Sequence, residues 1–305
     1  MTRGSNKDDA GPDLGGVLFV LGKGGVGKSV ISAGLAALAA RRGRPTLLVR
    51  IGESLEEVET WERTVVSGKD GVDEVKLDAR VAMDEYVQHV IRLRPLVERI
   101  TNSEVYRKFF AAAPGLPELV LLGRIRAYST ETDRQGKPRY QTIIVDCPSS
   151  GHGLLMLETP FAAFRAVPVG PFARLASQII DWLKSAARVA LVAIPEEMAV
   201  VEAIEFKDDL EERTGLKTSM AFMNRMRLSN LSKAARVALV EVDAPEGSND
   251  RRLLDCAREV QRRSRLESFH ERRLARGLNL QPVIVRDLPN CRPKTVASAL
   301  APEAA

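Results

Sequence analysis

Two consecutive segments indicate the fold: the run Val17-Leu18-Phe19-Val20-Leu21 and the octapeptide after it, Gly22-Lys23-Gly24-Gly25-Val26-Gly27-Lys28-Ser29. The first run is continuously apolar, which is typical of a strand buried in a parallel sheet. The octapeptide matches G-x-x-x-x-G-K-[ST], in which glycines let the backbone curl so that several N–H groups point at phosphate. Residues 29–42 are rich in Ala and Leu and predict a helix whose positive end completes the loop. The sequence therefore predicts a phosphate-binding loop between a buried strand and a helix.

Two side chains of this loop are expected to carry the phosphate and metal chemistry. Lys28 is placed for the β- and γ-phosphates of a nucleotide, and the Ser29 hydroxyl is placed for Mg²⁺. A carboxylate is expected nearby, because Asp146 ends a later apolar run and suits Mg²⁺ coordination, directly or through water. Lys28, Ser29 and Asp146 are therefore the candidate residues for binding a nucleotide with Mg²⁺.

Apolar runs alternate with helical patterns along much of the chain. Residues 46–51 predict a second strand, which forms a βαβ unit with the first strand and the helix. Such alternation favours an α/β fold with an open, mostly parallel sheet flanked by helices. The later predicted strands are residues 142–145, 189–194, 219–223 and 282–285.

The segment from about 56 to 138 interrupts this alternation. Met83, Tyr86, Val87 and Val90 recur at helical spacing, which indicates an amphipathic helix. We predict a mostly helical insertion within a single domain that spans residues 17–291. Residues 1–16 are predicted to be a flexible tail and residues 292–305 a loose tail. The sequence leaves open whether the apolar stripe of the insertion is packed core or a groove for a client protein.

The composition limits the class of protein. Of the 305 residues, 45% are apolar and 28% charged, which is ordinary for a folded soluble protein. The chain has no apolar run suited to a membrane span, and residues 1–16 lack the apolar segment of a secretory signal. The three cysteines, Cys147, Cys256 and Cys291, are scattered, which suits a reducing cytoplasm.

The net charge of +5 is mild, and its densest basic stretch is residues 251–276. Acidic residues interrupt that stretch, and Glu259 can pair with Arg262 and Arg263 at helical spacing. No aromatic residues are interleaved in a way that favours base stacking. We therefore expect a solvated helix and no nucleic-acid partner.

The place of Lys23, early in the loop, resembles the deviant Walker A motif of the group that includes MinD, ParA, the nitrogenase iron protein and ArsA. In that group this lysine reaches across a dimer interface to the nucleotide of the opposite subunit. The resemblance implies the P-loop NTPase fold, ATP or ADP with Mg²⁺ as ligands, and a dimer.

A second segment indicates the branch of this group. The ArsA-type ATPases have a switch II segment similar to Asp146-Cys147-Pro148-Ser149-Ser150-Gly151-His152-Gly153-Leu154, and an adenine loop similar to Phe222-Met223-Asn224-Arg225. The resemblance covers residues 17 to about 289. It implies that Gly151 and His152 respond to the γ-phosphate and that the Asn224 amide reads the adenine edge. The nucleotide contacts that it implies are Gly22, Gly24, Gly25, Val26, Gly27, Lys28, Ser29, Val30, Asn224, Arg225, Leu288 and Pro289.

Three departures from the family pattern bear on activity. The family's switch I reads D-P-x-x-S-L after the second strand, and its Asp positions the attacking water. Here the stretch is Val49-Arg50-Ile51-Gly52-Glu53-Ser54-Leu55, which is two residues shorter and lacks that Asp. Glu53 is the only carboxylate in this stretch, so we expect slow or absent hydrolysis by the chain alone. The zinc-binding CxxC of the targeting ATPases and the cysteine triad of the arsenite pump have no counterparts, so no structural zinc or arsenite is expected.

Two functions follow from the resemblance to a family that includes the arsenite-pump ATPase and the ATPases that target tail-anchored membrane proteins. The first is an ATPase that acts as a nucleotide-gated dimer, with itself or an ArsA-like paralogue, and handles a client or partner protein. The second is a weakly catalytic or non-catalytic nucleotide-binding subunit of such a heterodimer. Two further functions are less favoured. A MinD- or ParA-like positioning factor would be supported by a terminal amphipathic helix, which the sequence does not indicate. A metalloid-pump ATPase would need a cysteine triad that the sequence does not contain.

Overall fold

The computed structural model describes residues 12–51, 66–67, 71–90, 99, 101–104, 106, 115–227 and 232–300. Glu53 and the rest of the predicted switch I after Ile51 lie outside these residues. So do most of the predicted flexible tail, residues 91–98 and 107–114 of the predicted insertion, and residues 301–305.

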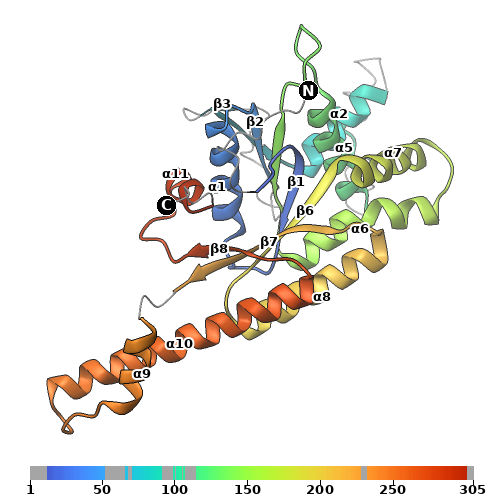
Figure 1. Cartoon of the computed structure of the whole chain (residues 1–305). Coiled ribbons are helices and arrows are strands. Elements are labelled where there is room, and N and C mark those ends of the chain that lie inside the picture. Colours follow the sequence, from blue (N-terminus) through green and yellow to red (C-terminus); the bar gives the residue numbers. More distant parts are fainter. Residues whose placement is uncertain are drawn as a thin grey trace, which may run out of the picture.

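An eight-stranded sheet forms the centre of the described part of the molecule (Figure 1). Its order is β3-β4-β2-β5-β1-β6-β7-β8, and all neighbouring strands are parallel except β3 and β4. The prediction of a mostly parallel α/β sheet is therefore confirmed. The strands are β1 (Gly16–Leu21), β2 (Thr46–Ile51), β3 (Val66–Ser67), β4 (Val72–Leu77), β5 (Thr142–Asp146), β6 (Ala187–Ala193), β7 (Thr218–Met226) and β8 (Val283–Arg286).

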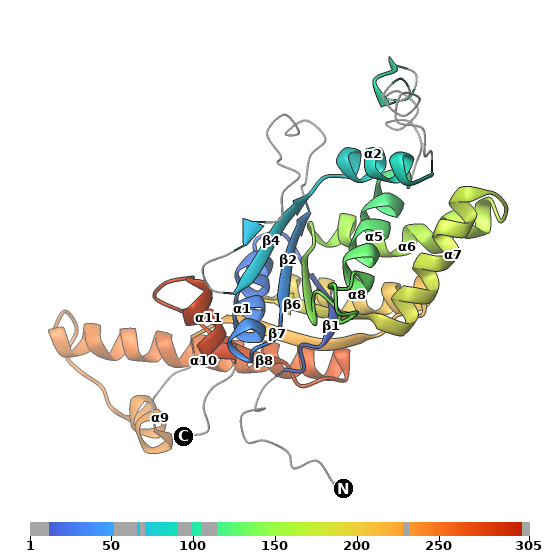
Figure 2. The ribbon, with the colours of Figure 1, turned by 90° about the horizontal axis from the view of Figure 1, so that it is seen from above.

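Helices cover both faces of the sheet (Figure 2). Because successive side chains of a strand point to opposite faces, each central strand contributes to two cores. Leu18 and Leu48 face the first core, on the side of α1 and α11, and Phe19 and Leu47 face the second. The first face carries α1 (Lys28–Arg41) and α11 (Pro293–Leu300). The second carries α2 (Ala79–Val90), α5 (Leu116–Thr130), α6 (Ser150–Ala166), α7 (Pro171–Ala186) and α8 (Glu197–Thr214).

The segment predicted as a mostly helical insertion contains a strand of the main sheet. β4 pairs in parallel with β2, and its Val75 and Leu77 are buried. The prediction for residues 56–138 is therefore wrong over residues 72–77. These residues read VDEVKL, with apolar side chains at alternate positions toward the strand's end, as expected for a strand whose other face is partly polar. The predicted amphipathic helix follows β4 as α2, with Met83 and Val87 buried.

The prediction of a loose C-terminal tail is wrong over residues 293–300. These residues form α11, which lies along α1 and buries Val296, Ala297 and Leu300. Gly34 of α1 permits this close approach, because a Cβ at position 34 would collide with the Val296 side chain. The segment has only eight residues, which is too short for its apolar spacing to indicate a helix in the sequence.

The predicted solvated basic helix lies in α10 (Asn249–Leu278), a helix of 30 residues that packs on α8. Glu259 accepts hydrogen bonds from Arg262 at 2.8 Å and from Arg263 at 2.7 Å, as the helical spacing predicts. No helix among the described residues is long and apolar enough to cross a membrane.

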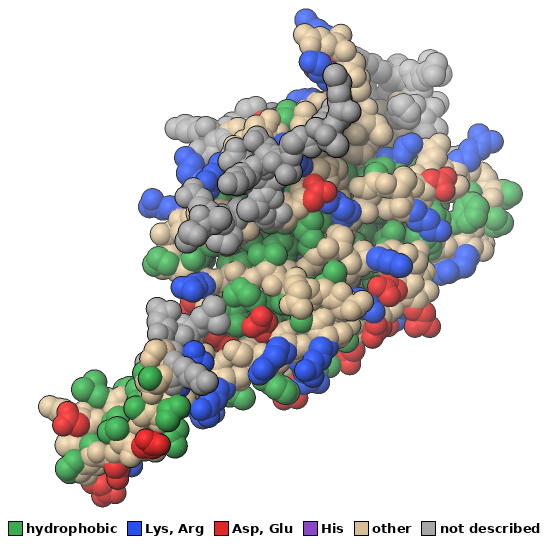
Figure 3. Space-filling model, viewed as in Figure 1, with side chains coloured by type: hydrophobic (Ala, Val, Ile, Leu, Met, Phe, Trp, Pro, Cys, Tyr) green, Lys and Arg blue, Asp and Glu red, His purple; other side chains and the backbone are tan. Residues whose placement is uncertain are grey.

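The helical extension formed by α9 (Lys233–Glu241) and the first half of α10 projects away from the sheet (Figure 1). Hydrophobic side chains gather at its end, at the lower left of Figure 3. In this part of the chain, α9 exposes Val237 and Val240, and the first half of α10 exposes Leu253. This extension is distinct from the edge of the sheet that carries the phosphate-binding loop.

Candidate nucleotide-binding site

The phosphate-binding loop connects β1 to α1, as the sequence predicts. Gly25 and Gly27 have φ angles of 82° and 93°, in the left-handed region that favours glycine. Gly22 packs directly on β6, where a Cβ would collide with the carbonyl oxygen of Val192. The glycines are thus required both by the backbone turn and by the close packing of the loop on the sheet.

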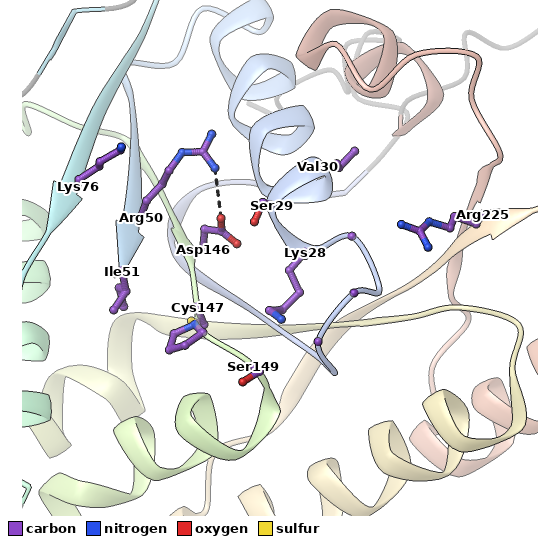
Figure 4. Close-up of a pocket in the computed structure, with 14 residues that line it drawn as sticks. Lys28, Ser29, Val30, Arg50, Ile51, Lys76, Asp146, Cys147, Ser149 and Arg225 are labelled. Atoms are coloured by element: carbon purple, nitrogen blue, oxygen red, sulfur yellow. Dashed lines mark hydrogen bonds and ion pairs between the residues drawn. The ribbon is translucent and has the colours of Figure 1, made fainter. Parts of the chain in front are cut away.

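A cavity of about 780 Å³ lies between this loop and the carboxyl ends of β2, β4 and β5 (Figure 4). It is large enough for a nucleotide-sized ligand. It brings together residues from the loop, from the end of β5 and from two strands on the far side of β5. The lining residues are Gly24, Gly25, Gly27, Lys28, Ser29, Val30, Arg50, Ile51, Lys76, Asp146, Cys147, Pro148, Ser149 and Arg225.

The amino end of α1 opens into this cavity and presents Lys28 and Ser29. The Lys28 side chain is buried, and its Nζ donates a hydrogen bond to the carbonyl oxygen of Lys23 at 3.2 Å. The first turn of α1 contains no acidic side chain that would occupy the anion position. Backbone N–H groups, the positive helix end and the Lys28 ammonium together favour a bound phosphate.

Asp146 is the last residue of β5 and lies buried beside the loop. Its Oδ1 accepts a hydrogen bond from Ser32 Oγ at 3.4 Å. Burial raises the pKa of the Asp146 carboxyl, while a hydrogen bond from Ser29 and the charges of Arg50 and Lys28 oppose the increase. The Ser29 hydroxyl and the Asp146 carboxylate are oxygen ligands of the kind that Mg²⁺ takes, so the residues present fit this metal.

Arg50 is the side chain whose place the sequence left unassigned. In the sheet register it lies opposite Asp146 of β5 on one side and opposite Lys76 of β4 on the other. Its Nη1 lies 3.3 Å from Asp146 Oδ2, and its Nε lies 2.5 Å from Glu74 Oε1. Figure 4 shows Arg50 pointing toward Asp146 and Ile51 pointing away from it. A basic side chain therefore contacts the predicted metal-binding carboxylate directly.

Lys23 forms an ion pair within the chain. Its Nζ forms an ion pair at 2.6 Å with Oε1 of Glu202 in α8, and both side chains are partly exposed. Lys23 does not line the cavity that contains Lys28. The side chains of the two loop lysines therefore have different surroundings: Lys28 lines the cavity, and Lys23 pairs with Glu202 of α8.

Asn224 lies inside β7, which continues to Met226, so the prediction that the strand ends before Asn224 is corrected. The amide is buried, and its Nδ2 donates to the carbonyl oxygen of Val26 at 2.9 Å. A Cβ on Gly27 would collide with the same Nδ2. Asn224 therefore braces the phosphate-binding loop, while the next residue, Arg225, lines the cavity with a φ of 57°.

Four further predicted site residues lie outside the lining of the cavity. Gly151 and His152 are exposed in the first turn of α6, outside the lining of the cavity. Leu288 packs against the core on the α1 side, and Pro289 is exposed, so neither lines the cavity. Their predicted contacts with a nucleotide stay predictions.

Cys147 also lines the cavity, but its thiol is buried, and this burial raises its pKa, so it has the character of an unreactive structural cysteine. Among the described residues, no group of three His, Cys, Asp or Glu side chains could hold a metal ion. The expected absence of a zinc site stays a prediction, since the described residues are only part of the chain.

Several residues that line the cavity were not predicted as site residues, and Lys76 is one of them. It comes from β4, the strand hidden in the predicted insertion, and it lies beside Arg50 in the register. The alternation of Val75 and Leu77 in VDEVKL is a sequence signal for β4, but it is too short to distinguish a strand from a helix or a loop. Once β4 is placed beside β2, a row of charged side chains along this face of the sheet follows from strand alternation alone.

The parallel sheet, the glycine loop between β1 and α1, and the carboxylate at the end of β5 define an α/β fold of the P-loop NTPase type. The sequence model of one family, ArsA_ATPase, described as anion-transporting ATPase, matches residues 16–181, more than half of the chain. The chain belongs to this family of ATPases.

Relatives of known name agree with this assignment. ATPase BagA of Mycobacterium tuberculosis is 27% identical over 239 residues, which cover 74% of this chain and 70% of BagA. A putative arsenical pump-driving ATPase of Halobacterium salinarum is 25% identical over 68% of this chain, but only over 35% of its own length. ATPase ASNA1 homolog 2 of Paramecium tetraurelia is 24% identical over 47% of this chain and 43% of its own.

Proposed function

We propose that this chain binds ATP with Mg²⁺ in the cavity beside β5 and acts as a nucleotide-gated dimer that handles a client or partner protein. The observation that carries the proposal is the convergence of Lys28, Ser29 and Asp146 on one cavity at the amino end of α1. Membership of an ATPase family supports nucleotide binding as the use of this cavity.

The protein's own groups would bind and orient the triphosphate. Lys28 and the loop N–H groups would hold the β- and γ-phosphates, and Arg225 would border the nucleotide on the β7 side. Ser29 and Asp146 would hold Mg²⁺, which when bound neutralises phosphate charge. Adenine is expected at the β7 side of the loop, where the amide of Asn224 lies, and ADP would occupy the same site after hydrolysis.

Dimerisation is proposed to depend on Lys23. In the single chain this lysine pairs with Glu202, and the pair is partly exposed, so opening it costs little free energy. Lys23 would then be available to contact the nucleotide of an opposing subunit. The partner is either a second copy of this chain or an ArsA-like paralogue.

Handling of another protein is supported by exposed apolar residues on the second face of the sheet. The end of α6, the start of α7 and the connection between them expose Phe164, Val167, Val169 and Phe172. Clustered exposed apolar side chains of this kind commonly mark protein interaction sites. The ring centroids of Phe172 and Tyr86 of α2 are 6.0 Å apart, so this surface adjoins a described part of the predicted insertion.

The second candidate is a weakly catalytic or non-catalytic nucleotide-binding subunit of a heterodimer. Arg50, the penultimate residue of β2, favours it, because this basic side chain contacts Asp146 and the sequence after β2 supplies no water-positioning Asp. Loss of such a group commonly lowers the rate about a hundredfold or more. Glu53 would then be the remaining carboxylate for this role.

The deciding experiment measures ATP turnover and oligomeric state together for wild type, Glu53→Gln and Lys23→Ala, with and without an ArsA-like paralogue. We expect slow turnover by wild type alone, a further decrease in Glu53→Gln, and loss of nucleotide-dependent dimerisation in Lys23→Ala. Rapid turnover that survives Glu53→Gln would contradict the assignment of Glu53. Unchanged dimerisation of Lys23→Ala would contradict the role of Lys23 across the interface.

A further inference from the structure

Arg50 lies between two carboxylates on neighbouring strands. Its Nε is 2.5 Å from Glu74 Oε1 on β4, and its Nη1 is 3.3 Å from Asp146 Oδ2 on β5. All three residues lie on neighbouring strands and on the same face of the sheet, so strand register fixes where the guanidinium lies. Arg50 is therefore a built part of the cavity wall.

Basic side chains outnumber acidic ones in the lining of the cavity. Four of the lining side chains that the structure describes are basic, and Asp146 is the carboxylate among them. The basic side chains come from different elements: Lys28 from α1, Arg50 from β2, Lys76 from β4 and Arg225 from β7. A polyphosphate entering this cavity meets a large excess of positive charge before any metal ion is added.

The same arrangement acts against a divalent cation. Mg²⁺ needs the lone pairs of Asp146 or of a water molecule bound to it, and Arg50 already donates toward Oδ2. A fixed guanidinium beside the carboxylate also repels a second cation at short range. Arg50 thus favours the phosphate and disfavours the metal within one cavity.

We propose that Arg50 partly substitutes for Mg²⁺ as the counter-charge of the bound nucleotide, so that this chain binds ATP with little dependence on the metal. This inference rests on the proposed nucleotide site and adds a residue that controls its metal dependence. Arg50 acts in it as a positioning and charge-compensating residue, through Asp146 and the phosphates. Its effect is a reduced coupling between metal binding and nucleotide binding.

The test measures ATP affinity by calorimetry or with a fluorescent analogue, in excess Mg²⁺ and again in EDTA. The proteins are wild type, Arg50→Gln, which removes the charge, and Arg50→Lys, which keeps it. Arg44→Gln is the matched control, because Arg44 pairs with Asp13 and does not line the cavity. Thermal unfolding of each protein shows whether it is folded.

The expected changes in affinity follow from thermodynamic linkage, since one ligand commonly changes the affinity of a protein for a second ligand by about 5- to 150-fold. On this scale we expect removal of Mg²⁺ to weaken ATP binding by less than about fivefold in wild type and Arg44→Gln, and by about twentyfold or more in Arg50→Gln. Arg50→Lys is expected to fall between them. By reciprocity, Mn²⁺ followed by electron paramagnetic resonance should bind the ADP complex of Arg50→Gln about tenfold more tightly than that of wild type.

Equal metal dependence in wild type and Arg50→Gln would overturn the inference, and so would equal Mn²⁺ affinity in their ADP complexes. These results differ from a failure of the proposed function. If wild type did not bind ATP even with excess Mg²⁺, the nucleotide site itself would be wrongly assigned. If ATP bound normally and only the metal coupling were unchanged, the role of Arg50 alone would be wrong.

Discussion

The two sides of the cavity differ in how closely they follow the family pattern. One is the P-loop side, residues 22–29, where Lys28, Ser29 and the positive-φ glycines occupy the places that the motif predicts. The other is the β2–β4 side, where Arg50 and Lys76 line the cavity beside the predicted metal site and Arg50 also pairs with Glu74. Both sides meet at Asp146.

The two sides differ in how far apart in the sequence their interacting residues lie. On the P-loop side, consecutive residues fold back on themselves, so the backbone geometry is local and the spacing of the motif encodes it. On the β2–β4 side, each contact joins residues of different strands and depends on register. A phosphate-binding function can therefore be predicted from eight consecutive residues, whereas the proposed metal dependence rests on residues far apart in the chain.

The largest effect is expected from Lys28→Ala. Lys28 is buried at the amino end of α1, and its removal takes away the charged partner of the phosphates. A hydrogen bond to a charged group contributes up to about 3 kcal/mol, so ATP should bind about a hundredfold or more weakly. Competition binding measures this loss, with Lys217→Ala, an exposed lysine, as the control. Undiminished binding by Lys28→Ala would show that the P-loop side does not bind the nucleotide.

A smaller loss should separate two glycines of the same loop. Gly27 has a φ of 93°, and a Cβ there would collide with the Asn224 amide, whereas a Cβ on Gly24 meets nothing within 4 Å. Strain of this kind costs about 1–3 kcal/mol, so Gly27→Ala should weaken ATP binding about tenfold. Gly24→Ala should cost about twofold, in the range of unstrained exposed substitutions. Equal effects of the two substitutions on ATP affinity would mean that the loop geometry does not limit binding.

Asn224→Ala tests how β7 supports the loop and selects the base. The buried amide donates to Val26, and its loss leaves that carbonyl without this donor, which commonly costs about 1–3 kcal/mol. We expect a lower melting temperature and a reduced preference for ATP over GTP, measured by thermal unfolding and by competition. The exposed Asn249→Ala is the control. A wild-type protein that prefers GTP would remove the predicted adenine selectivity.

The smallest effect is expected from Glu74→Gln on the β2–β4 side. The Arg50–Glu74 pair is partly exposed, with 30% and 42% of the two side chains accessible, and such pairs contribute about 0–1 kcal/mol. The free energy of unfolding should therefore fall by less than about 1 kcal/mol in chemical denaturation. A decrease of several kcal/mol would show that the charged row is a stability element, and the contrast between the two sides would then be structural as well as functional.

Much of the fold was predictable because its signals are local. The apolar run before Gly22 and the run ending at Asp146 were each recognised as buried strands, and both lie at the centre of the sheet. β4 was missed because one of its faces is polar. α11 was missed because its few apolar residues indicate a helix only once they are seen packed on α1. Neither element carries a period long enough to be distinguished from a loop or helix without its neighbours.

The sequence by itself determined the phosphate-binding loop, with Lys28 and Ser29 in place, because glycine spacing and a helix start are properties of consecutive residues. It also determined the carboxylate at the end of β5 and the family. Only the tertiary structure decided that Arg50 contacts Asp146, that Lys76 joins the cavity and that Asn224 braces the loop. These three placements depend on which strands are neighbours and in which register, and the sequence of each strand alone does not specify that pairing.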